Sequence, residues 1–138
     1  MDNRYFLVQG QIKEDEGKRL KPYNDSEGHL TIGYGRNLSA VGIHDDEAEL
    51  MFENDFSQAL AVAFKNVANF VDLSYNRKGV LIGMAFNLGE KGFKGFKKMI
   101  AAVEKEDFET AADEILDSKA ARQLPERYGR YAEEMRKG

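Results

Sequence analysis

Apolar residues recur every three or four positions along most of this chain, and every second position along one short stretch. The first spacing places side chains on one face of an α-helix, and the second places them on one face of a β-strand. Helices are predicted at 4–16, 45–66, 74–88, 94–104, 107–118 and 125–136, and a β-hairpin is predicted around 20–35. This order of elements predicts an α+β fold that is mostly helical.

The first predicted helix carries an acidic residue on its apolar side. Tyr5, Val8 and Ile12 follow helical spacing, and Glu16 continues the same stripe. The two acids before Glu16 fall on other faces, and Gly17 is suited to end the helix. We therefore expect Glu16 to point inward. Loss of hydration favours the protonated form of a carboxylate, which is the form a general acid needs.

The predicted hairpin combines a polar turn with a strand that has two unlike faces. Asp25 lies in the turn sequence 24–28. The apolar face of the following strand, which we expect to pack inward, consists of Leu30, Ile32 and Tyr34. The opposite face, which we expect to be open to a ligand, consists of His29, Thr31, Gly33 and Gly35. Two carboxylates in unlike surroundings are the minimum that glycoside hydrolysis requires, and Thr31 adds a hydroxyl beside them.

The remaining pattern predicts a helical scaffold in a single domain of 138 residues. The helix at 45–66 is long enough to join two lobes. We expect a small lobe at 14–45 and a larger lobe formed by 1–13 and 60–138. Ser74 is suited to cap the helix that follows it, Gly89 to end that helix, and Pro125 to begin the last one.

Composition narrows the class of protein. Hydrophobic residues make up 42% of the chain and charged residues 32%, which is typical of a globular domain. Cysteine is absent, so disulfides, thiolate nucleophiles and cysteine metal ligands are excluded. The net charge is −4, and no nucleic-acid-binding motif is visible, so we expect no nucleic-acid partner. We also expect no stable membrane insertion and no signal peptide, because no long apolar run is present.

The stretch from Glu16 to Gly35 closely resembles the phage lysozymes of glycoside hydrolase family 24, the T-even phage lysozyme type. It reads Glu-Gly-x-x-Leu-x-x-Tyr-x-Asp-x-x-Gly-x-x-Thr-Ile-Gly-x-Gly. The spacing between Glu16, Asp25 and Thr31 carries most of this resemblance. Further similarity lies at 46–49, 54–55, 84–89, 92–96, 111–112 and 125–127, so it extends over nearly the whole chain.

The resemblance implies a muramidase that hydrolyses the β-1,4 bond between N-acetylmuramic acid and N-acetylglucosamine in bacterial peptidoglycan. Glu16 would be the general acid, Asp25 the base or electrostatic partner, and Thr31 would position water with it. The family inverts configuration, which implies a separation of roughly 6.5–9.5 Å between the two carboxyl groups. No cofactor is expected, because two carboxylates and water suffice for this reaction. No metal site is expected either, because His29 and His44 are too few and too isolated in the sequence to form one.

Several other residues receive roles from the same resemblance. Arg127 occupies the position of an arginine that pairs with the catalytic acid and would stabilise its ionised form. Arg36 and Asp55 align with an ion pair between the hairpin and the long helix. Substrate contacts are expected at Asn87, Gly35 and Leu38. The segment 36–45 is short compared with larger members of the family, so we expect a reduced small lobe.

Two other classes of function stay open at this point. A lytic transglycosylase cleaves the same bond with an acid alone, and a peptidoglycan-binding module would keep the fold without the activity. Asp25 and Thr31 favour hydrolysis over both. The expected partners are peptidoglycan glycan strands and, by family, a holin-type release protein. We expect a monomer held in the host cytoplasm until it is released to the cell wall or periplasm.

Overall fold

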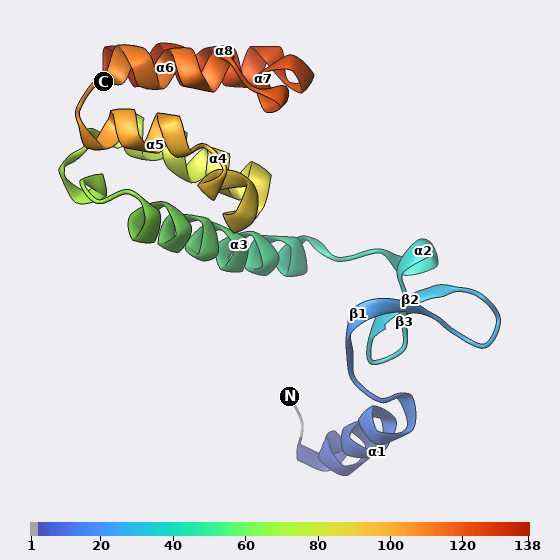
Figure 1. Cartoon of the computed structure of the whole chain (residues 1–138). Coiled ribbons are helices and arrows are strands. Elements are labelled where there is room, and N and C mark those ends of the chain that lie inside the picture. The colour runs from blue at the N-terminus through green and yellow to red at the C-terminus, as the bar shows by residue number, and fades with distance from the viewer. Residues whose placement is uncertain (1–2) are drawn as a thin grey trace. The chain divides into compact units, whose positions relative to one another are not determined.

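The computed structural model describes residues 3–138 and divides into two compact units, residues 1–49 and residues 50–138 (Figure 1). The predicted lobes divided the chain differently, with residues 1–13 assigned to the larger lobe. Residues 1 and 2 of that segment lie outside the described residues. The assignment of 1–13 to the larger lobe stays a prediction.

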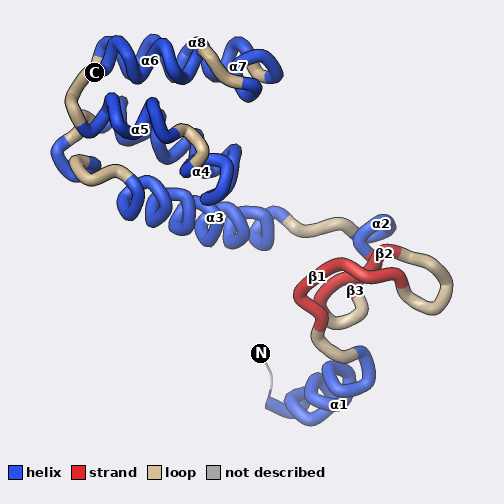
Figure 2. The backbone as a smooth tube through the Cα atoms, viewed as in Figure 1, coloured by secondary structure: helices blue, strands red, loops and turns tan. Residues whose placement is uncertain are grey.

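The first unit contains a short helix and a small antiparallel sheet. After the 3-10 turn η1 (Asn3–Tyr5), helix α1 covers Phe6–Glu16. Strands β1 (Arg19–Asn24), β2 (Leu30–Gly33) and β3 (Arg36–Asn37) form a three-stranded sheet in the order β1-β2-β3, and helix α2 (Leu38–Val41) follows. The strands stand out in red in Figure 2, with the long β1–β2 turn in tan.

The central strand β2 pairs with a neighbour on each side. Thr31 lies opposite Tyr23 of β1 and opposite Asn37 of β3. The predicted exposure of the two β2 faces is wrong at three positions. Thr31 is buried, whereas Leu30 and Tyr34 of the apolar face are exposed. Burial of Thr31 carries little cost because its hydroxyl group has a hydrogen-bond partner within the turn.

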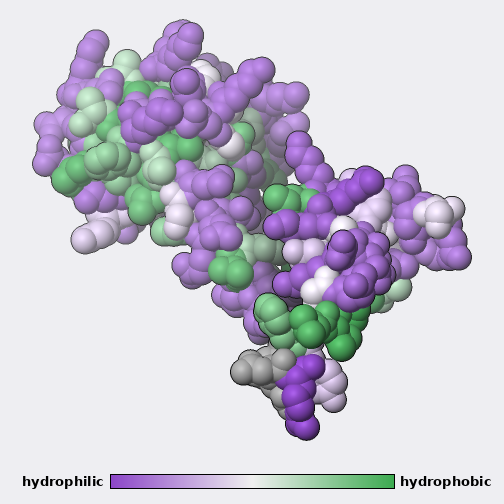
Figure 3. Space-filling view, turned by 90° about the horizontal axis from the view of Figure 1, so that it is seen from below, coloured by the Kyte–Doolittle hydropathy of each residue, from purple (hydrophilic) through white to green (hydrophobic). Residues whose placement is uncertain are grey.

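Helix α1 also differs from its prediction. None of its described side chains is buried, and Tyr5, Val8 and Ile12 are all more than half exposed. Figure 3 shows hydrophobic residues on the surface beside the grey N-terminal residues. The first unit by itself therefore leaves this apolar stripe uncovered.

The long helix α3 spans Asp45–Asn66, as the sequence predicts. It begins in the first unit and continues into the second. Of its predicted apolar face, Ala59 and Ala63 are buried, whereas Phe52 and Phe64 are about half exposed. The elements that follow are η2 (Phe70–Asp72), α4 (Tyr75–Lys94), α5 (Lys97–Glu104), α6 (Phe108–Leu116), α7 (Lys119–Gln123) and α8 (Pro125–Lys137).

Helix α4 provides the centre of the core of the second unit. Ser74 caps it by accepting a hydrogen bond from the Arg77 N–H, and Gly89 breaks its helical geometry with φ of 74°. Val80 and Leu81 are fully buried, in agreement with the predicted central helix. No helix within residues 3–138 is both long and apolar enough to cross a membrane.

Candidate active site

The turn between β1 and β2 holds Asp25 through both its side chain and its backbone. Asp25 Oδ1 accepts hydrogen bonds from the N–H groups of Glu27 at 2.9 Å and His29 at 2.8 Å. The Asp25 N–H donates to the His29 carbonyl oxygen at 2.9 Å and closes the turn. Because Oδ1 has two donors, Oδ2 is the oxygen left for chemistry, and it lies 3.5 Å from His29 Nδ1.

These contacts favour the ionised form of Asp25. The backbone N–H of His29 is the main cause that lowers the pKa of the Asp25 carboxyl group, and partial desolvation opposes it. The Glu27 N–H and the imidazole of His29 lower this pKa further. An exposed fraction of 35% keeps the Asp25 side chain in contact with water. A carboxylate of this kind is suited to accept a proton.

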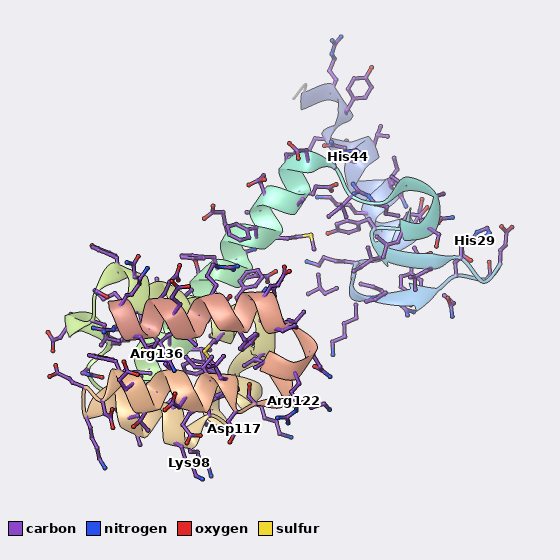
Figure 4. All side chains as sticks on the ribbon, turned by 90° about the horizontal axis from the view of Figure 1, so that it is seen from above. His29, His44, Lys98, Asp117, Arg122 and Arg136 are labelled. Carbon is purple, nitrogen blue, oxygen red and sulfur yellow. The ribbon has the colours of Figure 1, made fainter. Side chains whose placement is uncertain are left out.

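Thr31 is joined to the same turn through the His29 carbonyl oxygen. Thr31 Oγ1 donates to that oxygen at 2.8 Å, and the residue is only 3% exposed. A hydroxyl group has one hydrogen, so Thr31 Oγ1 can only accept from any further partner. The structure therefore brings Asp25 and Thr31 together as donors to one carbonyl group. Figure 4 shows His29 at the outer end of the hairpin.

Glu16 lies at the end of α1, against the turn that follows β2. Gly17 ends the helix with φ of 74°, and its N–H donates to the Lys13 carbonyl oxygen at 2.8 Å. Gly35 has φ of 70°, and a Cβ atom built there would overlap the Glu16 carboxylate. Glu16 is an exposed residue, which differs from the inward position that we expected. Its carboxylate nevertheless approaches the Gly35 backbone as only a glycine permits.

Arg36 forms an ion pair with Glu47 in the first turn of α3. Glu47 also accepts a hydrogen bond from the His44 N–H at 2.7 Å. The Arg36 guanidinium is the main cause that lowers the pKa of Glu47 to about 2. Asp55 lies in the other unit, so the expected pair between Arg36 and Asp55 stays a prediction. Leu38, an expected substrate contact, is the half-buried first residue of α2.

In the second unit, a groove of about 860 Å³ brings together Asn87 and Arg127, two of the predicted site residues. Its apolar lining consists mainly of aromatic side chains, namely Phe52, Phe56, Phe70, Tyr75, Phe86 and Tyr131. The buried Tyr128 hydroxyl donates to Asn87 Oδ1 at 2.7 Å. This bond fixes the Asn87 amide and leaves its N–H₂ group available as a donor.

The first unit also places His44 beside acidic side chains at the start of α3. Ligand atoms of His44, Asp46 and Glu47 lie within 4.8 Å of one another. His44 is therefore less isolated than its sequence position suggests. Glu47 Oε1 already binds the Arg36 guanidinium and the His44 N–H. Only some of the oxygen and nitrogen atoms of this cluster are therefore available to a metal ion. The expectation that no metal binds stays a prediction.

A model of the phage lysozyme family matches residues 13–130. The chain belongs to the phage lysozyme family. A probable T4-type lysozyme 1 of Dictyostelium discoideum is 27% identical, with 89% of each chain covered. The endolysin of Salmonella phage P22 is 28% identical, with 84% of this chain and 83% of the endolysin covered. An endolysin of Acyrthosiphon pisum secondary endosymbiont phage 1 is 34% identical over 59% of this chain and 57% of its own.

Membership of the phage lysozyme family supports a peptidoglycan-lytic enzyme. It also confirms the mostly helical α+β fold that the sequence predicts. The matched region includes Glu16, Asp25, Thr31 and Arg127.

Three residues that contribute to the two units were missed by sequence reasoning. The sequence places His29 only on the open face of the hairpin strand, although an Asp followed four positions later by His in a turn is a recognisable local signal. The sequence analysis did not single out Glu47, although its spacing of three from His44 is that of a capping residue. Tyr128 carries no local signal, because its bond to Asn87 spans 41 positions.

Proposed function

We propose that this phage lysozyme family member is a muramidase. It hydrolyses the β-1,4 bond between N-acetylmuramic acid and N-acetylglucosamine in peptidoglycan, with inversion at the anomeric carbon. Glu16 donates a proton to the leaving oxygen, and Asp25 accepts a proton from the attacking water. The reaction needs no cofactor, because the two carboxylates supply both proton transfers.

The hydrogen bonds of the hairpin turn are the observation that carries this proposal. Thr31 Oγ1 already donates its only hydrogen to the His29 carbonyl oxygen. Asp25 Oδ2 can accept a hydrogen bond from water, because the two backbone donors bind Oδ1. A water that donates one hydrogen to Thr31 and the other to Asp25 keeps a lone pair free for attack. Proton transfer to Asp25 then generates the nucleophile as the bond to carbon forms.

The position of Glu16 beside Gly35 supports its role as the acid. Close approach to the Gly35 backbone limits the positions that the Glu16 carboxylate can adopt. An acid held in the reacting geometry transfers its proton faster than an acid that moves freely. We further propose that Arg127 pairs with Glu16 after proton transfer, when the carboxylate is ionised. Substrate contacts are proposed for Asn87, Gly35 and Leu38.

Product analysis on purified peptidoglycan tests the reaction directly. We expect new reducing ends, with the α-anomer released first from the β-linked substrate in an NMR time course. Products with 1,6-anhydro ends would overturn the hydrolase and indicate a lytic transglycosylase. The β-anomer as first product would overturn inversion.

The Glu16→Gln variant tests the assignment of the acid. It keeps the size of the side chain and removes the proton donor, so clearing of a cell-wall suspension should fall by roughly 10²- to 10⁴-fold. Equal clearing by wild type and variant would show that Glu16 is not the acid. Absence of clearing by both, with wall binding retained, would favour a binding module.

We also propose that the chain acts as a monomer, is held in the host cytoplasm, and reaches the wall through a holin-type partner. Expression of the chain in a bacterial host should leave the cells intact until the membrane is permeabilised, for example with chloroform. Lysis without permeabilisation would contradict this route. Size-exclusion chromatography with light scattering should give a mass near 15.6 kDa.

A further inference from the structure

His29 contacts both Asp25 and Thr31, and it does so through three different groups. Its N–H donates to Asp25 Oδ1 at 2.8 Å. Its carbonyl oxygen accepts from the Asp25 N–H at 2.9 Å and from Thr31 Oγ1 at 2.8 Å. Its imidazole Nδ1 lies 3.5 Å from Asp25 Oδ2. The backbone contacts need no particular side chain at position 29, so the imidazole is the part of His29 that adds a chemical property to the turn.

The charged groups that face this imidazole are both acidic. Asp25 Oδ2 lies 3.5 Å from Nδ1, and Glu27 Oε2 lies 3.8 Å from it. Among residues 3–138, no side chain from the helices or strands of the first unit forms an ion pair with His29. Two backbone N–H groups hold the Asp25 carboxylate in place, whereas the Glu27 side chain is 78% exposed. Asp25 is therefore the partner that a protonated His29 binds.

The charge of His29 decides how strongly its imidazole occupies Asp25 Oδ2. A protonated imidazole carries a hydrogen on both ring nitrogens, so Nδ1 donates to the carboxylate in a charge-assisted hydrogen bond. A neutral imidazole can carry its hydrogen on Nε2, and Nδ1 then has nothing to donate. Oδ2 is also the oxygen that the proposed attacking water needs, because the backbone donors occupy Oδ1. Water and a protonated His29 therefore compete for one atom.

We propose that His29 is a positioning residue that makes the base pH-dependent. When it is protonated, it binds Asp25 Oδ2 and excludes the attacking water, and when it is neutral, it leaves this oxygen free. Histidine side chains change charge between about pH 5 and 8. Asp25 stays ionised in this range, because its contacts hold its pKa below the ordinary value of 3.8. This inference rests on the proposed function, since it concerns the water-activating group of the same reaction.

Two variants that fix the charge at position 29 test the proposal. His29→Phe keeps a ring without charge, and His29→Lys stays positive from pH 5 to 8. Rates of wall clearing are divided by the wild-type rate at each pH, which removes the titrations that all forms share. His29→Phe should match wild type near pH 8 and exceed it roughly two- to fivefold near pH 5, the size of an exposed ion pair. His29→Lys should match wild type near pH 5 and fall below it by a similar factor near pH 8.

The pairing is also tested without substrate, by NMR titration of the Asp25 carboxyl group. The imidazole of His29 contributes to the lowered pKa of Asp25, so this pKa should rise in His29→Phe. His44→Phe is the matched control, because His44 is the other histidine of the chain. Figure 4 shows it at the start of α3, away from the hairpin turn. This control should leave the pKa of Asp25 and the pH dependence of clearing unchanged.

Three results would overturn the inference. They are an unchanged pKa of Asp25 in His29→Phe, a ratio of clearing rates that stays constant from pH 5 to 8, or loss of the pH effect in Glu27→Gln. Thermal unfolding at the wild-type temperature confirms that each variant is folded. A constant ratio with an active wild type rejects this inference alone. Absence of clearing by wild type rejects the proposed function and, with it, any control of that reaction by His29.

Discussion

The two units of this protein are stabilised by different kinds of interaction. Among the described residues, every buried apolar side chain lies between Ala59 and Met135, and Thr31 is the only buried residue of the first unit. The first unit instead contains a dense set of short-range polar bonds around Asp25, Thr31 and Arg36. The second unit thus supplies most of the burial, and the first unit supplies the proposed proton-transfer groups.

The contrast predicts that stability and activity respond to substitutions in different units. A core substitution in the second unit should lower the free energy of unfolding. A substitution in the hairpin turns should alter activity with a smaller loss of stability.

The largest expected effect is on stability, from Leu81→Ala in α4. Leu81 is fully buried, and removal of its side chain loses transfer free energy and leaves a cavity, at a cost of about 2–5 kcal/mol. The control is Leu20→Ala in β1, where the side chain is 82% exposed and the change should stay within about 0.5 kcal/mol. Urea unfolding followed by circular dichroism measures both. Similar losses at the two positions would contradict the comparison.

The next effect is on activity, from Gly35→Ala. The added Cβ would overlap the Glu16 carboxylate and displace it. A displacement of about 1 Å at a reacting group is enough to reduce the rate by roughly 100-fold. Gly33→Ala is the matched control, since Gly33 has the same φ of 70° but no atom within 4 Å of its Cβ position. Rates of wall clearing should separate the two variants, while their unfolding free energies fall by similar amounts. Equal loss of activity would attribute the effect to backbone strain alone.

Local signals in the sequence predicted much of the helical part correctly. The bounds of α3, the Ser74 cap, the break at Gly89 and the start of α8 at Pro125 were all predicted. Each depends on a residue and its near neighbours, so one sequence contains the necessary information. The short helices α2 and α7 were missed because four or five residues show too little periodicity.

Burial and long-range pairing were harder to predict. Alternation along β2 identified its two faces but not the exposure of single positions on them: Thr31 is buried with its hydroxyl hydrogen-bonded, whereas Leu30 and Tyr34 are exposed. Several acidic residues of α3 could have formed an ion pair with Arg36. Only the geometry of the segment between β3 and α3 selects Glu47 as its partner. The roles of Glu16, Asp25 and Thr31 stay predictions, since they concern chemistry and not contacts.

A smaller effect is expected from Tyr128→Phe, which tests a polar bond inside the otherwise apolar second unit. The Tyr128 hydroxyl is buried and donates to Asn87, so its removal should cost about 1 kcal/mol. Tyr131→Phe is the control, because no hydrogen bond of the Tyr131 hydroxyl is found among the described residues. Thermal unfolding gives both values. If Asn87 also contacts substrate, KM should rise in Tyr128→Phe alone.

The smallest effect concerns the ion pair of Arg36 and Glu47, whose contribution to stability is lost only in acid. The folded-state pKa of Glu47 is about 2, mainly because of Arg36, against an ordinary value of 4.5. The stabilisation is therefore fully present above about pH 4.5 and is lost as the pH falls towards 2. Glu47→Gln removes the titration, so its unfolding free energy should approach that of wild type across this window. For Glu49→Gln, two positions along the same helix, the unfolding free energy should instead follow a pH profile parallel to that of wild type.

Because Glu47 is more than a third exposed, solvent screening keeps the effect of the Arg36–Glu47 pair small. Parallel pH profiles for wild type and Glu47→Gln would show that this pair contributes nothing to folding, and that the Asp25 turn alone organises the first unit.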